Sequence, residues 1–167
     1  MTRETDLHER LDRLESESAI RTLVHEYCHG ADKRDLRRFA AVWTPDAVWQ
    51  VAPTQEFRGV EAICAAVEWQ WSAFPQMHHW TANLVIDLDG DEARGEVDVS
   101  VTTRLPDGAW LRGGGVYRDT YVRTDLGWRI SRREAEHLFS LDPRAGQDPG
   151  TPDRHEALGA GSGNPER

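Results

Sequence analysis

The chain has 167 residues, 38% of them apolar, which is typical of one globular domain with a sizeable core. Its formal charge of −9 argues against a nucleic-acid or anionic-membrane partner, because both attract a basic surface. No apolar run approaches the ~18 residues that span a bilayer. The charged N-terminal residues are also unlike a secretory signal peptide. We therefore expect a cytoplasmic protein that binds neither nucleic acid nor membranes.

The first part of the chain carries two helical patterns. Leucines recur at helical spacing over residues 6–15, and Ser16 and Ser18 are candidate caps of a second helix. An apolar stripe in this second helix includes Tyr27 and places its side chain on the buried face. Asp32 follows five residues later, at the expected end of the helix.

Two more helices and a strand follow. Apolar residues share one face over 36–43, which predicts a short helix that Thr44-Pro45-Asp46 ends. Residues 47–52 read as a strand. Residues 60–73 read as a third helix that ends before Pro75.

The second half of the chain has the two-residue period of strands. Residues 77–88, 93–105, 109–124 and 128–139 read as successive strands joined by turns. Three glycines, Gly113–Gly115, predict a bulge or bend inside the third of these strands. A phosphate-binding loop is the rival interpretation. It is disfavoured because no helix follows and no Lys-Ser/Thr pair accompanies the glycines.

Helices followed by antiparallel strands indicate the α+β class. We expect a curved, mostly antiparallel sheet wrapped around the N-terminal helices, forming a cone with an apolar pocket for a small organic ligand. The domain spans residues 1–140. Residues 141–167 contain few large apolar side chains and are expected to form a flexible tail.

Tyr27, Asp32 and His79 are the candidate catalytic residues. A histidine whose ring is held by a buried carboxylate is a general base near neutral pH. Each residue also has a structural interpretation: Tyr27 as a core tyrosine, Asp32 as a turn or cap residue, and His79 as a structural histidine. Asn83 shares the strand parity of His79 and is expected to face the same side, either as a site residue or as a strand-end hydrogen-bonding group. A metal site at His78 and His79 is disfavoured, since neighbouring strand residues point to opposite faces.

Several short motifs occur in a characteristic order over residues 10–140. In chain order they are Tyr27-x₄-Asp32, Trp43-x-Pro-Asp-Ala-x-Trp49, Gly59-Val-Glu-Ala-Ile63, His79-x₃-Asn83, Asp89-Gly-Asp91 and Gly127-Trp-Arg-Ile-Ser-Arg-Arg133. With this order the chain resembles the SnoaL-like branch of the NTF2-like superfamily. Within that branch it resembles the group of hexachlorocyclohexane dehydrochlorinase, bile-acid 7α-dehydratase and scytalone dehydratase.

The resemblance implies a cone-shaped α+β barrel, usually a homotrimer, without a metal or organic cofactor. It implies that Asp32 and His79 form a His–Asp pair inside the cone. Tyr27 matches a position that is Tyr in the bile-acid enzyme and Lys in the dehydrochlorinase, which favours loss of water over loss of HCl.

The resemblance also places substrate-binding residues. Trp49 matches a pocket-lining tryptophan, and Trp43 or Trp80 is expected to complete an apolar wall. Arg133 matches a pocket arginine on the last strand, although a slip of one residue would put Arg132 there instead.

Together these features predict a cofactor-independent lyase, a dehydratase for a hydrophobic hydroxylated small molecule. His79 would take a proton from carbon and Asp32 would stabilise the imidazolium. Tyr27 would protonate the leaving hydroxyl or hydrogen-bond a carbonyl, and Arg133 would neutralise developing charge. A double-bond isomerase and a polyketide-type cyclase use the same first step. A non-catalytic subunit resembling a dioxygenase β-subunit and a plain ligand-binding module remain as alternatives.

Overall fold

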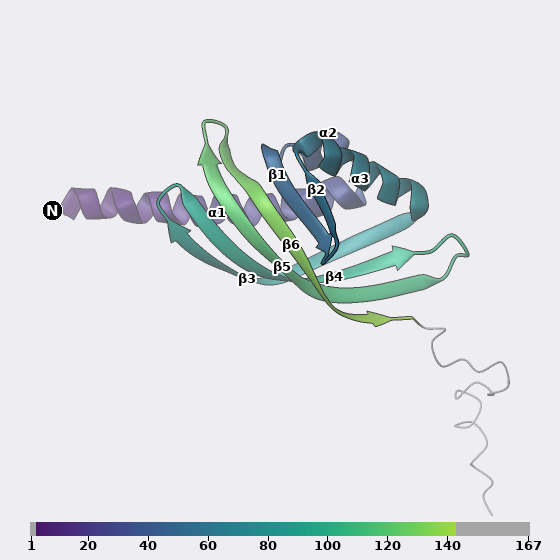
Figure 1. The fold of residues 1–167 in the computed structure, drawn as a ribbon. Helices are drawn as coiled ribbons and strands as arrows, with labels where there is room; N and C mark the ends of the chain where they lie inside the picture. Colours follow the sequence, from purple (N-terminus) through teal and green to yellow (C-terminus); the bar gives the residue numbers. More distant parts are fainter. Residues whose placement is uncertain (1–2, 143–167) are drawn as a thin grey trace, which may run out of the picture.

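The computed structural model describes residues 3–142, and their side chains from Asp6 onward. A long helix, α1 (Arg3–Asp32), lies along a curved sheet, and α2 (Leu36–Ala40) and α3 (Val60–Ala73) lie together near one end of it (Figure 1). The predicted α+β class is confirmed. Most of the predicted tail, from residue 143 onward, lies outside the described residues. None of the described helices is long and apolar enough to cross a bilayer.

The sheet has six strands in the order β2-β1-β6-β5-β4-β3. In chain order the strands are β1 (Trp43–Ala52), β2 (Gln55–Arg58), β3 (Gln76–Asp89), β4 (Glu92–Arg104), β5 (Trp110–Thr124) and β6 (Gly127–Leu141). Strands β1 and β6 pair in parallel, and the other neighbouring strands pair antiparallel. Since β2 and β3 are its two edges, the sheet curves without closing into the expected barrel.

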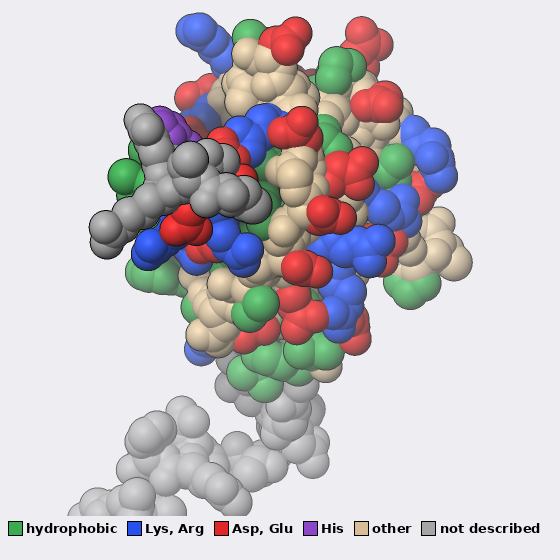
Figure 2. All heavy atoms as spheres, turned by 90° about the vertical axis from the view of Figure 1, so that its left-hand side faces the viewer, with side chains coloured by type: hydrophobic (Ala, Val, Ile, Leu, Met, Phe, Trp, Pro, Cys, Tyr) green, Lys and Arg blue, Asp and Glu red, His purple; other side chains and the backbone are tan. Residues whose placement is uncertain are grey.

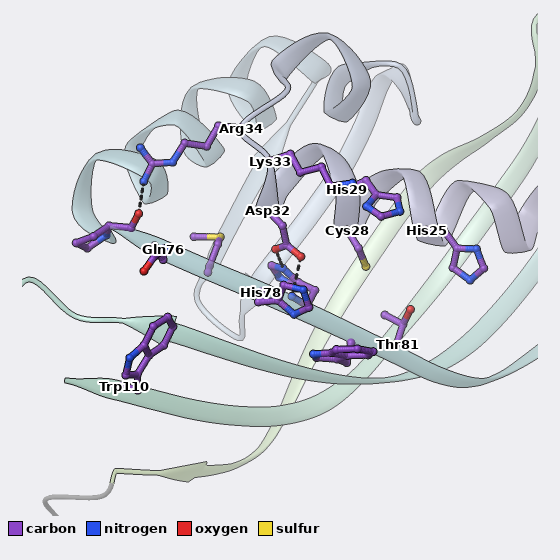
Figure 3. Close-up of a pocket in the computed structure, with 14 residues that line it drawn as sticks. His25, Cys28, His29, Asp32, Lys33, Arg34, Gln76, His78, Thr81 and Trp110 are labelled. Carbon is purple, nitrogen blue, oxygen red and sulfur yellow. Dashed lines mark hydrogen bonds and ion pairs between the residues drawn. The ribbon is translucent and has the colours of Figure 1, made fainter. Parts of the chain in front are cut away.

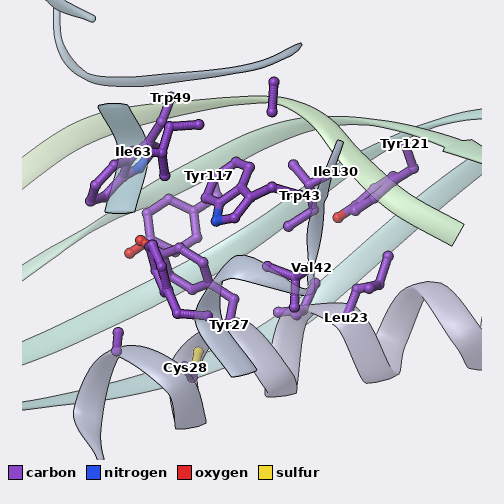
Figure 4. Close-up of a cluster of buried hydrophobic side chains, with 14 of the residues drawn as sticks. Leu23, Tyr27, Cys28, Val42, Trp43, Trp49, Ile63, Tyr117, Tyr121 and Ile130 are labelled. Carbon is purple, nitrogen blue, oxygen red and sulfur yellow. The ribbon is translucent and has the colours of Figure 1, made fainter. Parts of the chain in front are cut away.

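The core lies between the inner face of the sheet and the three helices (Figure 4). Aromatic rings fill its centre, where Tyr27 of α1 packs against Phe39, Trp43, Trp49 and Tyr117 with ring centroids 5.2–6.3 Å apart. Aromatic side chains each bury a large apolar area. The interior of the cone is therefore filled by side chains close to the sheet.

The two predicted N-terminal helices are one continuous helix, so the predicted break at Ser16 is wrong. The Ser16 hydroxyl donates to the carbonyl of Asp12 one turn earlier (2.7 Å) and accepts from Arg123 of β5 (3.0 Å). A serine that bonds back to the preceding turn can stay inside a helix. Ser16 is buried against β5, which explains why a small side chain occurs at this position although its neighbours in the sequence are charged.

The connection after α1 also differs from the prediction. Helix α2 ends at Ala40, and Trp43 begins β1 instead of closing the helix. The Asp35 carboxylate caps α2 by accepting from the backbone of Arg38 (3.0 Å). Thr44-Pro45-Asp46 lies within β1, where it interrupts the pairing with β6 between Trp43 and Val48.

Charged side chains alternate in sign over the outer surface. Arg118 pairs with Glu96 and Glu136 across three strands, and Arg123 joins β5 to Asp12 of α1. Figure 2 shows acidic and basic side chains interspersed on the end of the molecule from which α1 projects. Exposed pairs of this kind contribute roughly 0–1 kcal/mol each, so the fold depends mainly on its core.

The predicted glycine bulge in β5 is confirmed. The pairing of β5 with β6 shifts register between Gly114 and Gly115. A side chain at Gly115 would collide with the carbonyl oxygen of Glu136, so the strand can bend here only without a Cβ atom.

Replacing Gly115 by Ala should therefore lower the free energy of unfolding by about 1–3 kcal/mol. Gly113→Ala is the matched control. Its Cβ would lie 3.7 Å from the nearest atom, so we expect a change within ~0.5 kcal/mol. Urea unfolding followed by tryptophan fluorescence measures both variants. Equal midpoints would contradict this account of the bulge.

Candidate active site

The end of α1 and the start of β3 meet through Asp32 and His79. One carboxylate oxygen of Asp32 lies 2.5 Å from Nδ1 of His79, and the other accepts from the His79 backbone N–H at 2.8 Å. Both side chains are about nine-tenths buried, with exposures of 10% and 8%. Because an ionised carboxylate only accepts, this contact favours the tautomer of a neutral His79 ring with its proton on Nδ1, in which Nε2 is the acceptor.

A cavity of about 1000 Å³ opens beside this pair, between α1 and β3 (Figure 3). Residues 25–34 of α1 and the turn after it supply one wall, residues 75–81 supply the other, and Trp110 of β5 lies at one end. The volume is enough for a small organic molecule. The Asp32–His79 pair is therefore buried and borders a space where a ligand can bind.

Tyr27 packs edge-on against the imidazole of His79, with ring centroids 6.0 Å apart. Its side chain belongs to the core and does not line the cavity. Burial raises the pKa of Tyr27 to about 12, although the nearby charge of Arg133 acts in the opposite direction. Tyr27 is thus a neutral phenol that keeps its proton at neutral pH.

Arg133 points into the core, and unlike the predicted pocket arginine it does not line the cavity beside His79. It is fully buried, and its Nε and Nη2 atoms donate to the two carboxylate oxygens of Asp119 at 2.8 and 2.6 Å. Burial by itself lowers the pKa of the Arg133 guanidinium, but the charge and hydrogen bonds of Asp119, together with the nearby tyrosines Tyr27 and Tyr121, raise the pKa well above its ordinary value. Arg132 faces the other side of the sheet, where it pairs with Glu134.

The Arg133 guanidinium also lies over two tyrosine rings. Its central carbon is 4.1 Å from the ring centroid of Tyr27 and 4.3 Å from that of Tyr117. Such cation–π contacts are strongest away from water. Nη1 of Arg133 has no hydrogen-bond partner among the described residues, and the same holds for the buried indole nitrogens of Trp43 and Trp49.

The predicted tryptophan wall is only partly realised. Trp43 and Trp49 are buried in the core, and neither lines the cavity beside His79. Trp80 does line the cavity, but from its rim. It is 70% exposed and packs against the His78 ring with centroids 5.1 Å apart.

The expectation that Asn83 faces the same side as His79 is wrong. A β-bulge lies between Ala82 and Val85, and Asn83 has a positive φ of 57°. The extra residue reverses the alternation of side chains, so Asn83 is exposed and donates to Asp98 on the outer surface (2.7 Å). Asn83 is therefore no part of this site.

Sequence reasoning missed the buried partners of Tyr27 and Arg133. Tyr117, Asp119 and Tyr121 alternate along β5 and all point inward. The Tyr121 hydroxyl donates to Asp119 at 2.6 Å. In the sequence, the aspartate has the same strand parity as the two tyrosines, and this pattern predicts a buried carboxylate. A buried carboxylate needs a cation or several hydrogen-bond donors nearby.

No group of three or more histidine, cysteine or acidic side chains suited to a metal ion occurs among the described residues. Cys28 lines the cavity one helical turn before Asp32, and burial raises the pKa of its thiol. A protonated thiol is a weak nucleophile. Among the histidines that line this cavity, His79 is the one whose ring the Asp32 carboxylate holds.

Arg133→Met should lower the free energy of unfolding by about 3–5 kcal/mol, because it leaves the Asp119 carboxylate buried without a cation. Arg132→Met is the control on the neighbouring residue. Its exposed pairs should contribute no more than about 1 kcal/mol. Adding Asp119→Asn to Arg133→Met should recover part of the loss. Equal losses from the two single variants in urea unfolding would refute the buried pair.

The three tyrosines of the chain are all buried, and burial raises the pKa of each. In the unfolded chain phenols ionise near pH 10, whereas folded Tyr27 keeps its proton up to about pH 12. Above pH 10 the unfolded state therefore binds fewer protons, and stability falls as the pH rises.

An absorbance titration at 295 nm should accordingly show no ionisation near pH 10 in the folded protein. Tyrosinate should appear together with the loss of circular dichroism, and the chain in guanidinium chloride provides the reference curve. A tyrosine that titrates near pH 10 while the dichroism is unchanged would contradict the burial of these phenols.

Comparison with known proteins agrees with this fold. Residues 12–134 match the SnoaL-like domain family. The gamma-hexachlorocyclohexane dehydrochlorinase of Sphingobium indicum is 32% identical over 128 residues, which cover 75% of this chain and 82% of that protein. An uncharacterised protein of Mycobacterium tuberculosis is 30% identical over 136 residues, covering 77% and 86%.

Solved structures give the same result. A type 2 hexachlorocyclohexane dehydrochlorinase superposes with a TM-score of 0.76 at 26% identity, covering 80% of this chain and 92% of that one. A putative scytalone dehydratase of Novosphingobium aromaticivorans gives a TM-score of 0.73 at 25% identity, covering 78% and 89%. The chain belongs to the SnoaL-like family, has the NTF2-like fold, and is homologous to dehydrochlorinases, which are lyases.

Proposed function

We propose that this protein is a cofactor-independent lyase, a dehydratase that removes water from a hydrophobic hydroxylated small molecule. The observation that carries the proposal is the buried contact between Asp32 and His79 beside a cavity. Proton abstraction from carbon needs a general base beside the bound substrate. A histidine held by a carboxylate next to a ligand-sized cavity can supply that base.

In this mechanism Nε2 of His79 takes the proton from the carbon next to the activating group. Asp32 holds the Nδ1 proton and stabilises the imidazolium that forms. A positioned base of this kind accelerates a reaction roughly 10²–10⁴-fold. The electron pair of the broken C–H bond becomes the new double bond, and the C–O bond breaks with its pair on oxygen.

The departing hydroxyl needs a proton in order to leave as water, and Tyr27 is the proposed donor. Its phenol is neutral, and the guanidinium of Arg133 over its ring would stabilise the phenolate that remains. Tyr27 packs against the His79 ring and does not line the cavity, so this role requires the leaving group to reach past the imidazole. A Tyr27→Phe variant that loses stability but keeps its turnover would show that Tyr27 is a core residue only.

Loss of HCl is the second candidate, because the relatives at 32% identity are dehydrochlorinases. Chloride leaves without a proton, whereas hydroxide needs an acid. A tyrosine five residues before Asp32 therefore supports dehydration. A double-bond isomerase or cyclase would use the same abstraction by His79.

We also propose a homotrimer, in line with the family resemblance. The end of β6 supports assembly, because Leu138 and Phe139 are 59% and 45% exposed and border one surface depression. Apolar side chains gathered on a surface commonly mark contacts between proteins. The proposed substrate is a small molecule, with no nucleic acid or membrane as partner.

Screening hydroxylated steroids, polyketides and aromatic alcohols, together with chlorinated analogues, by mass spectrometry tests the reaction. We expect loss of water, and His79→Ala and Asp32→Asn should each lower turnover at least ~10²-fold with unchanged circular dichroism. His137→Ala, an exposed histidine on β6, is the matched control and should keep full turnover.

Near-full turnover in either the His79 or the Asp32 variant would remove these residues from the mechanism. If the wild-type protein and His79→Ala both bind ligands and neither turns any of them over, a ligand-binding module would be favoured. Copurification with a larger iron-bearing subunit would favour a non-catalytic partner role.

A further inference from the structure

We infer that the substrate is an aromatic acid, with a planar apolar body and one anionic group that the rim of the cavity holds. The inference rests on the proposed function for the identity of the site, and it narrows the class of substrate. It comes from the charges and rings that face the cavity between α1 and β3.

Among the charged and histidine side chains around this cavity, basic ones predominate. Lys33 and Arg34 carry fixed positive charges, and four of the lining residues are histidines: His25, His29, His78 and His79. The one carboxylate in the lining belongs to Asp32, which is already bonded to His79. The excess of basic side chains around the cavity contrasts with the whole chain, which has 29 acidic residues and 20 lysines and arginines.

Three of the basic side chains form a row. His25, His29 and Lys33 are spaced four residues apart, so they follow one face of α1 and continue past its end. All three are exposed and line the cavity, where Figure 3 shows them along one edge. A lysine here also complements the partial negative charge of a helix C-terminus. That effect also reaches His29 in the last turn of α1, but not His25.

Arg34 is held in place at the same edge. It has a positive φ of 56°, and its Nη2 atom donates to the carbonyls of Phe74 and Pro75 at 3.0 and 2.8 Å. These bonds fasten the segment that leads into β3 to the end of α1. Neither Lys33 nor Arg34 forms an ion pair within residues 3–142, so both charges remain available to a ligand.

The opposite side of the rim is aromatic. Trp80 of β3 and Trp110 of β5 line the cavity with 70% and 46% of their surfaces exposed. Indole faces bind planar rings and exclude water from them. An anionic group near Lys33 and a ring against these indoles would align the ligand along the cavity wall that contains His79.

Two fluorescent probes with the same aromatic framework test this inference. 8-Anilinonaphthalene-1-sulfonate carries an anionic group, and N-phenyl-1-naphthylamine lacks it. Lys33→Glu should raise the Kd of the sulfonate probe about three- to tenfold and leave that of the neutral probe within about twofold. Arg37→Glu, the same change of charge on α2 outside the cavity, should leave both Kd values unchanged. Trp110→Ala should weaken both probes.

An equal effect of Lys33→Glu on the two probes, or an effect no larger than that of Arg37→Glu, would overturn the inference. Indifference of both probes to Trp110→Ala would overturn it as well. Probe binding needs no turnover, so these failures leave the lyase proposal standing. Conversely, full turnover in His79→Ala would defeat the lyase mechanism while the probe results still report the charge preference of the rim.

Discussion

The bond between the Asp32 carboxylate and His79 fixes the geometry on which the rest of the site depends. Asp32 accepts from both the ring and the backbone of His79, and so ties the last residue of α1 to an edge strand. This requires α1 to end at a defined place. Gly30 makes that possible, because a Cβ atom there would lie 2.7 Å from the backbone of Phe39. Close packing of α2 on α1 thus sets the position of the base.

A second constraint lies one layer deeper, where Arg133 and Asp119 form a fully buried ion pair. Removing two charges from water is costly, and the pair recovers that cost only with good geometry and additional bonds. The hydroxyl of Tyr121 and the rings of Tyr27 and Tyr117 supply these contacts. The cone is consequently a packed aromatic core with a cation at its centre, and the ligand-sized space lies at the edge, between α1 and β3.

Sequence reasoning succeeded where strand alternation is regular and failed where it is interrupted. His79 and Arg133 point inward as their parity predicts, but the bulge at Asn83 cannot be read from a pattern with a period of two. Ser16 looks like a helix cap in the sequence, and only its contact with β5, more than a hundred residues later, shows otherwise. Asp119 was missed because its partner comes from β6, through a pairing that no local pattern reveals.

The tautomer of His79 tests the central claim most directly, and its measurement requires no substrate. Nitrogen-15 NMR of the labelled histidines at neutral pH should show Nδ1 of His79 protonated and Nε2 unprotonated. Asp32→Ala should abolish this preference, and the exposed His25 should be unaffected. A His79 ring that carries its proton on Nε2, or that averages between tautomers like an exposed histidine, would contradict the account.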